Sequence, residues 1–129
     1  MNYLIGDFLI RIKNAYMGGK KEVIFPYSKA VLSIAKILKE EGYIKEVKEK
    51  EEDGKKGFII NLVYKEKKPA IEDIKIISKP SVHVYVGKNK IKKIVGAHGL
   101  GIVSTSNGMM TAKNAIKKGV GGEVICQIF

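Results

Sequence analysis

Large apolar side chains recur at every fourth position near the beginning of the chain, and this spacing restricts what the chain can fold into. It places them on one face of an α-helix over residues 3–16, which Gly18 and Gly19 then end. The spaced residues are Leu4, Phe8, Ile12 and Tyr16. Because a helix with one apolar face must bury that face against another element, we expect the helix to contribute to a core.

The elements that follow supply a packing partner. Residues 22–25 predict a short strand, and Ser28 can cap a second helix. Two further strands are predicted at 43–48 and 58–64, joined by a charged hairpin tip over 48–56. The order helix, strand, helix, hairpin predicts an α+β unit whose helices pack on one face of a short sheet.

The second half of the chain is predicted to be mostly β-structure with one short helix. Thr111 can cap this helix, which runs to about Lys118. A charged connector at 65–69 indicates a domain boundary. We therefore expect an N-terminal α/β domain, 1–66, and a C-terminal domain, 67–129. The C-terminal strands are predicted at 71–77, 82–86, 100–103 and 123–129. The fold class is therefore α+β, built as two small α/β domains.

The positive charge is concentrated in the second half. The formal net charge is +11, and between Asp73 and Glu123 there is no acidic residue. The same stretch contains nine lysines: Lys75, Lys79, Lys88, Lys90, Lys92, Lys93, Lys113, Lys117 and Lys118. Since nothing nearby in the sequence neutralises them, they favour a polyanionic partner. A lysine-rich genome is the alternative explanation.

The kind of basic residue favours RNA over DNA. Only Arg11 is arginine, although the commonest specific DNA contact is a bidentate arginine on guanine in the major groove. Lysines act as point charges on phosphates, whereas hydroxyls and backbone groups suit the shallow minor groove of RNA with its 2′-OH groups.

Residues 104–111 form the most chemically dense stretch, with the sequence S-T-S-N-G-M-M-T. It lies between an apolar run ending at Val103 and the predicted helix, so we expect a strand-to-helix loop. Small side chains let hydroxyls and N–H groups approach a ligand closely, and a helix N-terminus adds partial positive charge. The stretch suits a phosphate or a sugar. An ordinary polar turn is the alternative.

Other kinds of site are poorly supported. Gly96, Gly99 and Gly101 are followed by a strand, whereas a dinucleotide-binding loop needs a helix there. A hydrolase would pair Ser104 or Ser106 with His83 or His98, yet no G-x-S-x-G motif is present. Two histidines and one cysteine lack metal-ligand spacing, and Cys126 lies in an apolar run that predicts burial. No apolar run approaches the ~20 residues of a membrane span and no signal-peptide pattern is present, so we expect a cytoplasmic protein.

Several single residues leave two interpretations open. Tyr85 lies in a strand flanked by lysine and either stacks on a base or ribose or covers the sheet edge. Glu123 either orients a lysine or accepts a hydrogen bond from an RNA hydroxyl. Arg11 and Lys13, with Asn14, lie off the apolar stripe of the first helix, on either a solvated or an RNA-facing surface.

Taken together, these motifs resemble the S8 family of small-subunit ribosomal proteins. The C-terminal pieces are S-T-S-N-G-M-M-T and G-G-E-V-I-C, and four other pieces occur in the family's order. These four are R-I-K-N-A at 11–15, P-Y-S-K at 26–29, K-E-E-G-Y-I at 39–44 and S-K-P at 78–80. The resemblance covers nearly the whole chain.

The resemblance implies a two-domain protein without enzymatic activity that binds a helical region in the central domain of small-subunit (16S) ribosomal RNA during 30S assembly. It implies neighbouring small-subunit ribosomal proteins as partners, and no cofactor, metal, membrane or small-molecule substrate. The C-terminal domain would make the main RNA contacts. An enzyme that binds a phosphorylated ligand at the 104–111 loop is the rival hypothesis.

The RNA-binding residues implied by the matched motifs fall into two groups. The C-terminal group comprises the loop with nearby residues, to which we add Asn107 and Lys88: Ser104, Thr105, Ser106, Asn107, Gly108, Tyr85, Lys88, Gly122 and Glu123. The N-terminal group would make peripheral contacts: Ser28, Lys29, Arg11 and Lys13.

The chain also departs from the family pattern. Only Val103 separates G-L-G-I from S-T-S, which puts Ala97 and His98 where glycine and leucine are expected. Ala112 and Asn114 replace acids in the short helix and remove favourable charge at its N-terminus. Ser81 replaces a usual glycine, so the turn there is expected to differ.

Overall fold

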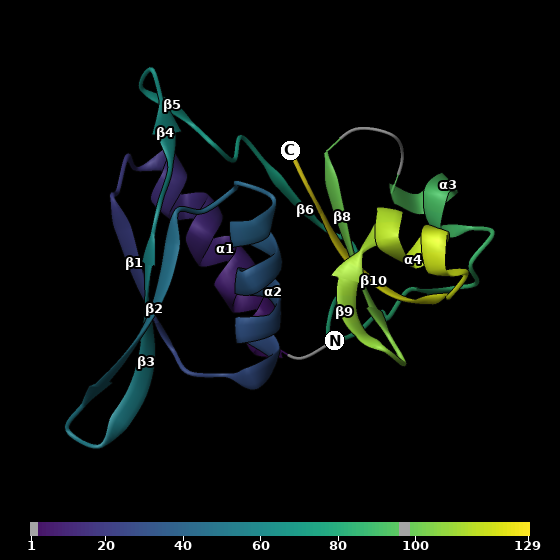
Figure 1. Ribbon diagram of the computed structural model, residues 1–129, viewed down its shortest axis with the longest axis horizontal. Helices are drawn as coiled ribbons and strands as arrows, with labels where there is room; N and C mark the ends of the chain where they lie inside the picture. The colour runs from purple at the N-terminus through teal and green to yellow at the C-terminus, as the bar shows by residue number, and fades with distance from the viewer. Residues whose placement is uncertain (1–2, 96–98) are drawn as a thin grey trace. The chain divides into compact units, whose positions relative to one another are not determined.

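A computed structural model describes residues 3–95 and 99–129, without the side chain of Tyr3 (Figure 1). The chain divides into two compact units. Asp7–Glu72 forms the N-terminal unit, and Asp73–Phe129 forms the C-terminal unit with the first described residues up to Gly6. The predicted segment containing Ala97 and His98, with Gly96, lies outside the described residues.

The N-terminal unit has the predicted order of helix, strand, helix and hairpin. Its strands form a three-stranded antiparallel sheet in the order β1-β3-β2, and both helices lie on one side of it in Figure 1. The elements are α1 (Tyr3–Met17), β1 (Glu22–Pro26), α2 (Lys29–Glu40), β2 (Glu46–Glu52) and β3 (Lys55–Asn61).

The periodicity of the sequence explains this packing. Every apolar residue of the four-residue repeat from Phe8 to Tyr16 is buried, and the rings of Phe8 and Phe25 meet edge to face with centroids 5.3 Å apart. Ile24, next to Phe25 in the strand, points to the other face and is 63% exposed, as the alternation of a strand requires. Ser28 caps α2 as predicted, because its hydroxyl accepts a hydrogen bond from the N–H of Val31.

The charged hairpin extends further than the sequence suggested. Strands β2 and β3 remain paired as far as Glu52 and Lys55, and Asp53 and Gly54 turn the chain with φ values of 52° and 76°. All of residues 48–56 are exposed, as predicted for a solvated hairpin tip. The predicted strand at 43–48 therefore begins later and continues into the charged run, because backbone pairing needs no apolar side chains.

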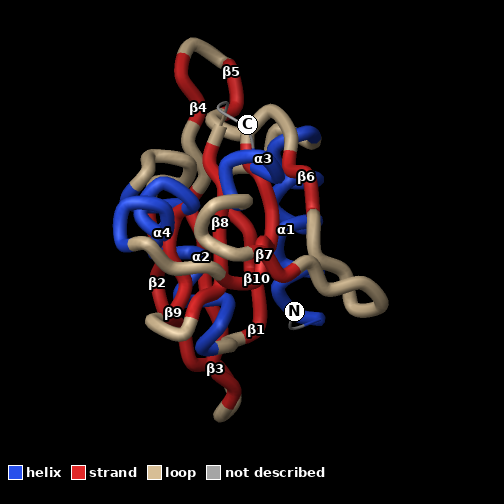
Figure 2. Tube along the Cα trace, turned by 90° about the vertical axis from the view of Figure 1, so that its right-hand side faces the viewer, coloured by secondary structure: helices blue, strands red, loops and turns tan. Residues whose placement is uncertain are grey.

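The predicted connector at 65–69 is itself a small hairpin. It consists of β4 (Tyr64–Lys65) and β5 (Lys68–Pro69), and it projects from the N-terminal unit at the end opposite to the β2–β3 tip in Figures 1 and 2. Tyr64 anchors this small hairpin to the segment after α1, since its hydroxyl donates to the carbonyl of Lys20 over 2.5 Å.

The C-terminal unit is mostly a five-stranded antiparallel sheet in the order β6-β10-β8-β9, with β7 also paired to β10. Its described residues also form two short helices. The sequence predicted only the second, whereas the first begins within the basic stretch at 88–93. The elements are β6 (Ile74–Ile76), β7 (Tyr85–Val86), α3 (Ile91–Val95), β8 (Leu100–Thr105), β9 (Gly108–Thr111), α4 (Ala112–Lys118) and β10 (Gly122–Ile128). The α+β class is confirmed.

Both short helices cover the same face of this sheet. They contribute four buried residues to a core with Val103, Met110 and Val124 of the strands; the helical residues are Ile91, Val95, Ala112 and Ala115. Gly101 allows the close packing, because a side chain there would collide with Val95 of α3 and approach Ala112 of α4. Cys126 is buried as predicted, and burial raises the pKa of its thiol to about 12.

Candidate nucleic-acid interface

The hydroxyl-rich stretch is a β-hairpin, and the predicted strand-to-helix loop is wrong. Ser104 and Thr105 end β8, Ser106 and Asn107 form the turn, and Gly108 begins β9. The turn residues are exposed, and Gly108 adopts a φ of 103°, which favours glycine. A strand between the hydroxyls and the helix was not visible in the sequence, because Met109 and Met110 fit either structure.

The three hydroxyls have different roles. Thr105 is built into the turn, since its hydroxyl donates to the carbonyl of Gly108 over 2.9 Å and accepts from the N–H of Asn107 over 3.1 Å. Within the part of the chain that the structure describes, the side chains of Ser104 and Ser106 have no hydrogen-bond partner. Two hydroxyls therefore remain available to a ligand.

Helix α4 begins away from the turn. Thr111 caps it as predicted, since its hydroxyl accepts from the N–H of Asn114 over 3.1 Å, and Gly119 ends it in the left-handed conformation. Thr111 pairs with Ile102, whereas the turn follows Thr105, three residues or about 10 Å further along the strand. The expected contribution of the helix N-terminus to the hydroxyl site is therefore wrong.

The strand register brings separate candidate residues into one line. Ser104 pairs with Met109 on one side and with Glu123 on the other, and Glu123 pairs with Tyr85. Residues directly opposite in neighbouring strands share a face of the sheet. Met109, Ser104, Glu123 and Tyr85 thus form a continuous line, which we call the cross-strand row.

The cross-strand row lies on the face away from α3 and α4. Val103 and Val124 contribute to the core beneath these helices, and their neighbours Ser104 and Glu123 must point the opposite way, because side chains alternate along a strand. Sequence reasoning had selected three residues of the row but missed Met109, which is half-buried. Only the pairing of β8 with β9 could have identified it.

Gly122 brings two of these strands together. A side chain at this position would collide with the carbonyl of Ser104 and come within 3.2 Å of the Cα of Thr105. Glycine therefore permits β10 to approach β8 beside the turn. This predicted site residue has a structural reason to be glycine, independent of any ligand.

His83 connects Glu123 to Tyr85. Its Nδ1 lies 2.7 Å from Oε2 of Glu123, and its ring stacks beside that of Tyr85 with centroids 6.1 Å apart and planes inclined by 22°. In the sequence, His83 was a candidate only for catalysis or metal binding, and Glu123 was expected either to orient a lysine or to accept a hydrogen bond from an RNA hydroxyl. The signal for its true position was its spacing of two residues from Tyr85, which places both on one face of an extended segment.

The environments of Glu123 and Tyr85 differ sharply. Glu123 is only 7% exposed, and burial alone would raise the pKa of its carboxyl group. Hydrogen bonds to the carboxylate, one of them from His83, nevertheless hold that pKa below its ordinary value, so the carboxylate is ionised at neutral pH. Tyr85 is 70% exposed, so most of its surface is open to solvent.

Ser78 anchors the segment that contains His83 and Tyr85. This fully buried residue donates from its hydroxyl to the carbonyl of Val124 over 2.6 Å and accepts from the N–H of Val84 over 3.0 Å. Lys79 and Val82 close a turn beside it through two backbone hydrogen bonds, with Ser81 exposed inside it. Ser78 thereby fixes the segment to β10.

The lysines of the C-terminal unit are exposed. This holds for all nine between Asp73 and Glu123, including Lys88, which follows β7. None of these lysines takes part in an ion pair within the described residues. The unit therefore presents uncompensated positive charge around a sheet that carries hydroxyls and an exposed aromatic ring.

The N-terminal candidate residues make more contacts within the protein than the hydroxyls of Ser104 and Ser106 do. Arg11 donates to the carbonyl of Ile24 over 3.2 Å and lies over the ring of Phe25, 5.1 Å from its centroid. Its guanidinium group thus connects α1 to β1. Ser28 is half-buried as the cap of α2, whereas the Lys29 side chain beside it is exposed. Lys13 is half-buried and also takes part in a noncovalent interaction, so it is not free either.

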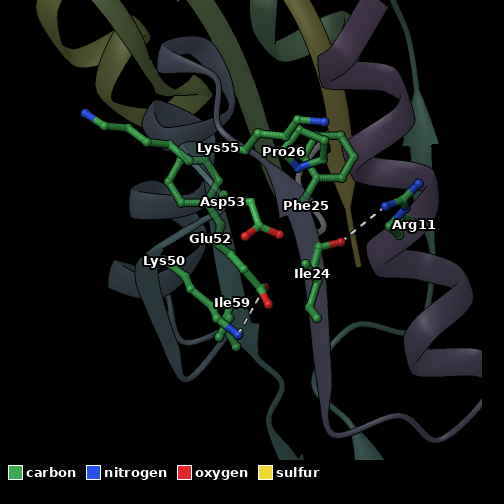
Figure 3. A pocket seen from close by; sticks show the side chains of 12 residues that line it. Arg11, Ile24, Phe25, Pro26, Lys50, Glu52, Asp53, Lys55 and Ile59 are labelled. Atoms are coloured by element: carbon green, nitrogen blue, oxygen red, sulfur yellow. Dashed lines mark hydrogen bonds and ion pairs between the residues drawn. The ribbon is translucent and has the colours of Figure 1, made fainter.

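A shallow pocket of about 520 Å³ lies in the N-terminal unit (Figure 3). Residues of β1 and of the β2–β3 hairpin line it, and its charged side chains include Arg11 and the ion pair of Lys50 with Glu52, whose Nζ–Oε2 distance is 3.6 Å. The pocket contains none of the C-terminal candidate residues.

Two other classes of site receive no support from the described residues. No group of three or more histidine, cysteine, aspartate or glutamate side chains is arranged to hold a metal ion among residues 3–95 and 99–129. None of the described helices has the length and hydrophobicity needed to cross a membrane.

Comparison with known proteins gives a consistent answer. The family model described as Ribosomal protein S8 matches residues 4–129. The protein named small ribosomal subunit protein uS8 from Syntrophomonas wolfei is 51% identical over 97% of this chain and 96% of its own length. The proteins of that name from Thioalkalivibrio sulfidiphilus and Thermosynechococcus vestitus are 46% and 37% identical, over 95% and 100% of this chain and 93% and 98% of their own lengths. The chain therefore belongs to the ribosomal protein S8 family, structural and non-enzymatic proteins of the small subunit of cytoplasmic ribosomes.

Proposed function

We propose that this protein binds a helical region in the central domain of 16S ribosomal RNA and supports assembly of the 30S subunit. The observation that carries the proposal is the cross-strand row, which places Ser104, Glu123 and Tyr85 side by side in register next to the exposed Ser106–Asn107 turn. An enzyme acting on a phosphorylated ligand is set aside, because the family is non-enzymatic.

The chemistry of the row suits the minor groove of RNA. The hydroxyls of Ser104 and Ser106 can donate to and accept from ribose 2′-OH groups and base edges. The ionised carboxylate of Glu123 can only accept, so it suits a 2′-OH or an amino group rather than a phosphate. Tyr85 presents an exposed ring on which an unpaired base or a ribose can stack.

The remaining candidates would have supporting roles. Thr105 and Gly108 shape the turn, Asn107 lies at its tip, and Gly122 allows close strand packing. Lys88, which follows β7 and is exposed, would attract phosphates in a salt-sensitive way. Peripheral RNA contacts remain a proposal for the N-terminal group, Ser28, Lys29, Arg11 and Lys13, as do contacts with neighbouring small-subunit proteins.

The two available hydroxyls provide the test. Replacing Ser104 and Ser106 together by alanine should weaken binding of the 16S fragment about 30-fold, since each lost hydrogen bond costs roughly 1 kcal/mol. A filter-binding titration measures this, and the melting temperature should stay nearly constant because neither side chain has a partner within the described structure. Thr105 is left intact, because its hydroxyl holds the turn.

Ser33→Ala is the matched control. Ser33 lies in α2, where its hydroxyl donates to the carbonyl of Lys29, and the variant should bind the RNA like the wild type. Unchanged affinity of the Ser104→Ala, Ser106→Ala variant would contradict the proposed interface.

A further inference from the structure

Helices α3 and α4 present a basic surface that the cross-strand row does not include. Each helix buries two residues against the sheet and leaves the rest exposed. Two lysines of each helix, with one isoleucine of each, form what we call the α3–α4 surface: Lys92, Lys93, Ile94, Lys113, Ile116 and Lys117. The two helices lie side by side in Figure 1.

This surface and the cross-strand row lie on opposite faces of the same sheet. The helices pack on Val103 and Val124, whereas Ser104 and Glu123, their neighbours in the strands, face the other way. Between the two surfaces lie the sheet and a layer of helix roughly 10 Å thick. A straight RNA duplex resting on the row therefore cannot also lie across the outer side of the helices.

The charge on the surface is not neutralised within the unit. The only acidic residues from Asp73 onward are Asp73 itself and Glu123. Asp73 accepts from the N–H of Ile74 at the start of β6, and Glu123 belongs to the row. Four exposed lysines without a carboxylate favour a polyanion, and the absence of arginine favours phosphate groups over base edges.

The apolar part of the surface is small. Ile94 and Ile116 are 40% and 43% exposed, and no other large exposed hydrophobic side chain of the described residues lies on these two helices. A protein interface normally has a larger apolar centre. The surface thus fits a phosphate backbone better than a folded protein.

We propose that the α3–α4 surface binds the phosphate backbone of a second RNA segment while the cross-strand row binds the first. This inference rests on the proposed function of the row. The C-terminal unit would then hold two RNA segments on the two sides of one sheet, and would fix their separation as the subunit assembles.

The test begins with the full-length protein saturated with the 16S fragment. A labelled 20-base-pair RNA duplex of unrelated sequence is then added at about 100 mM salt, and its binding is followed by fluorescence anisotropy and native mass spectrometry. We expect a complex of one protein, one 16S fragment and one duplex. Binding of the duplex should depend strongly on salt, with a slope near −3.6 in log K against log salt for four phosphate contacts.

A fourfold variant identifies the surface. Changing Lys92, Lys93, Lys113 and Lys117 together to glutamine should weaken duplex binding at least tenfold. The matched control changes four exposed lysines of the N-terminal unit to glutamine: Lys20, Lys36, Lys45 and Lys48. The control should keep duplex binding, and both variants should bind the 16S fragment to the same extent.

The outcomes separate this inference from the proposed function. Failure of the wild type to bind the 16S fragment would overturn the proposed function itself. If that fragment binds but the saturated protein takes up no duplex, or if the fourfold variant still binds the duplex, the second surface is wrong. Cross-linking in assembled subunits, with a reagent that has one amine-reactive and one photoreactive end, should join Lys92 and Lys117 to RNA. Cross-links to a protein alone would also overturn the inference.

Discussion

At the scale of single residues, His83 joins a buried carboxylate to an exposed aromatic ring. Its imidazole contacts Glu123 through Nδ1 and stacks against Tyr85 through its face. The two contacts serve different purposes. The first compensates a charge that is largely removed from water, and the second restricts the motion of a ring that protrudes into solvent.

Two substitutions should separate these contacts. His83→Asn keeps a polar partner for Glu123 but removes the ring, so the melting temperature should change little while RNA affinity falls. Stacking of a base on an aromatic ring contributes roughly 1–3 kcal/mol. Without the ring of His83, Tyr85 is less restricted, so part of this contribution is lost and binding should weaken about fivefold. His83→Phe keeps the ring but removes a hydrogen-bond partner of Glu123, so it should lower the melting temperature more than it lowers affinity.

Differential scanning calorimetry and filter binding measure the two effects, and Tyr85→Ala provides the reference for loss of stacking. In a Tyr85→Ala background, His83→Asn should have no further effect on affinity. An additional loss there of the same size as in the wild type would show that His83 does not act through Tyr85.

At the scale of elements, the β8–β9 hairpin shows how local chemistry shapes the candidate site. Its turn depends on the Thr105 hydroxyl, which makes two hydrogen bonds, and on the positive φ of Gly108. Neither feature contacts the core beneath α3 and α4. The hairpin can therefore be weakened at its tip without removing the apolar packing of the unit.

Gly108→Ala should destabilise the protein by about 1 kcal/mol, because alanine is strained at this φ, and should lower the melting temperature by a few degrees. Gly87→Ala is the matched control, since a side chain there meets nothing within 4 Å and its φ lies outside the positive range. Thermal unfolding followed by circular dichroism tests both. Equal melting temperatures for the two variants would contradict the strain assigned to Gly108.

At the scale of the whole molecule, charge and candidate chemistry are divided between two units. The cross-strand row lies entirely in the C-terminal unit, as do the nine lysines between Asp73 and Glu123. Residues 1–64 contain 12 basic and 9 acidic side chains, whereas 65–129 contain 12 and 4. The domain boundary at residues 66 and 67 remains a proposal, and fragments of the chain can test it.

A fragment of residues 70–129 should keep its preference for the 16S target over a scrambled RNA, because hydroxyl, ribose and stacking contacts carry the discrimination. A fragment of residues 1–68 should bind RNA weakly and without preference. Gel-shift titrations measure both, after circular dichroism has established that each fragment is folded, since roughly 60 residues are marginal for an independent core. If the folded N-terminal fragment alone distinguishes the 16S target from the scrambled RNA, the proposed location of the interface in the C-terminal domain is wrong.

The sequence alone was sufficient for features that depend on local chemistry. The four-residue apolar repeat predicted α1, Ser28 and Thr111 predicted helix caps, and the uneven distribution of acids predicted a basic C-terminal unit. The ordered motifs also predicted the family, because they occur together over nearly the whole chain. Each of these depends on residues that are close in the sequence or on composition, so no long-range pairing had to be known.

Only the tertiary structure decided which distant residues share a face. The register of β9, β8, β10 and β7 aligned Met109, Ser104, Glu123 and Tyr85, and it placed α3 and α4 behind them. A shift of one residue in any of these pairings would turn the side chains of that strand to the opposite face. The partner of Glu123 was equally hidden, because His83 lies 40 residues away in the sequence and 2.7 Å away in the fold.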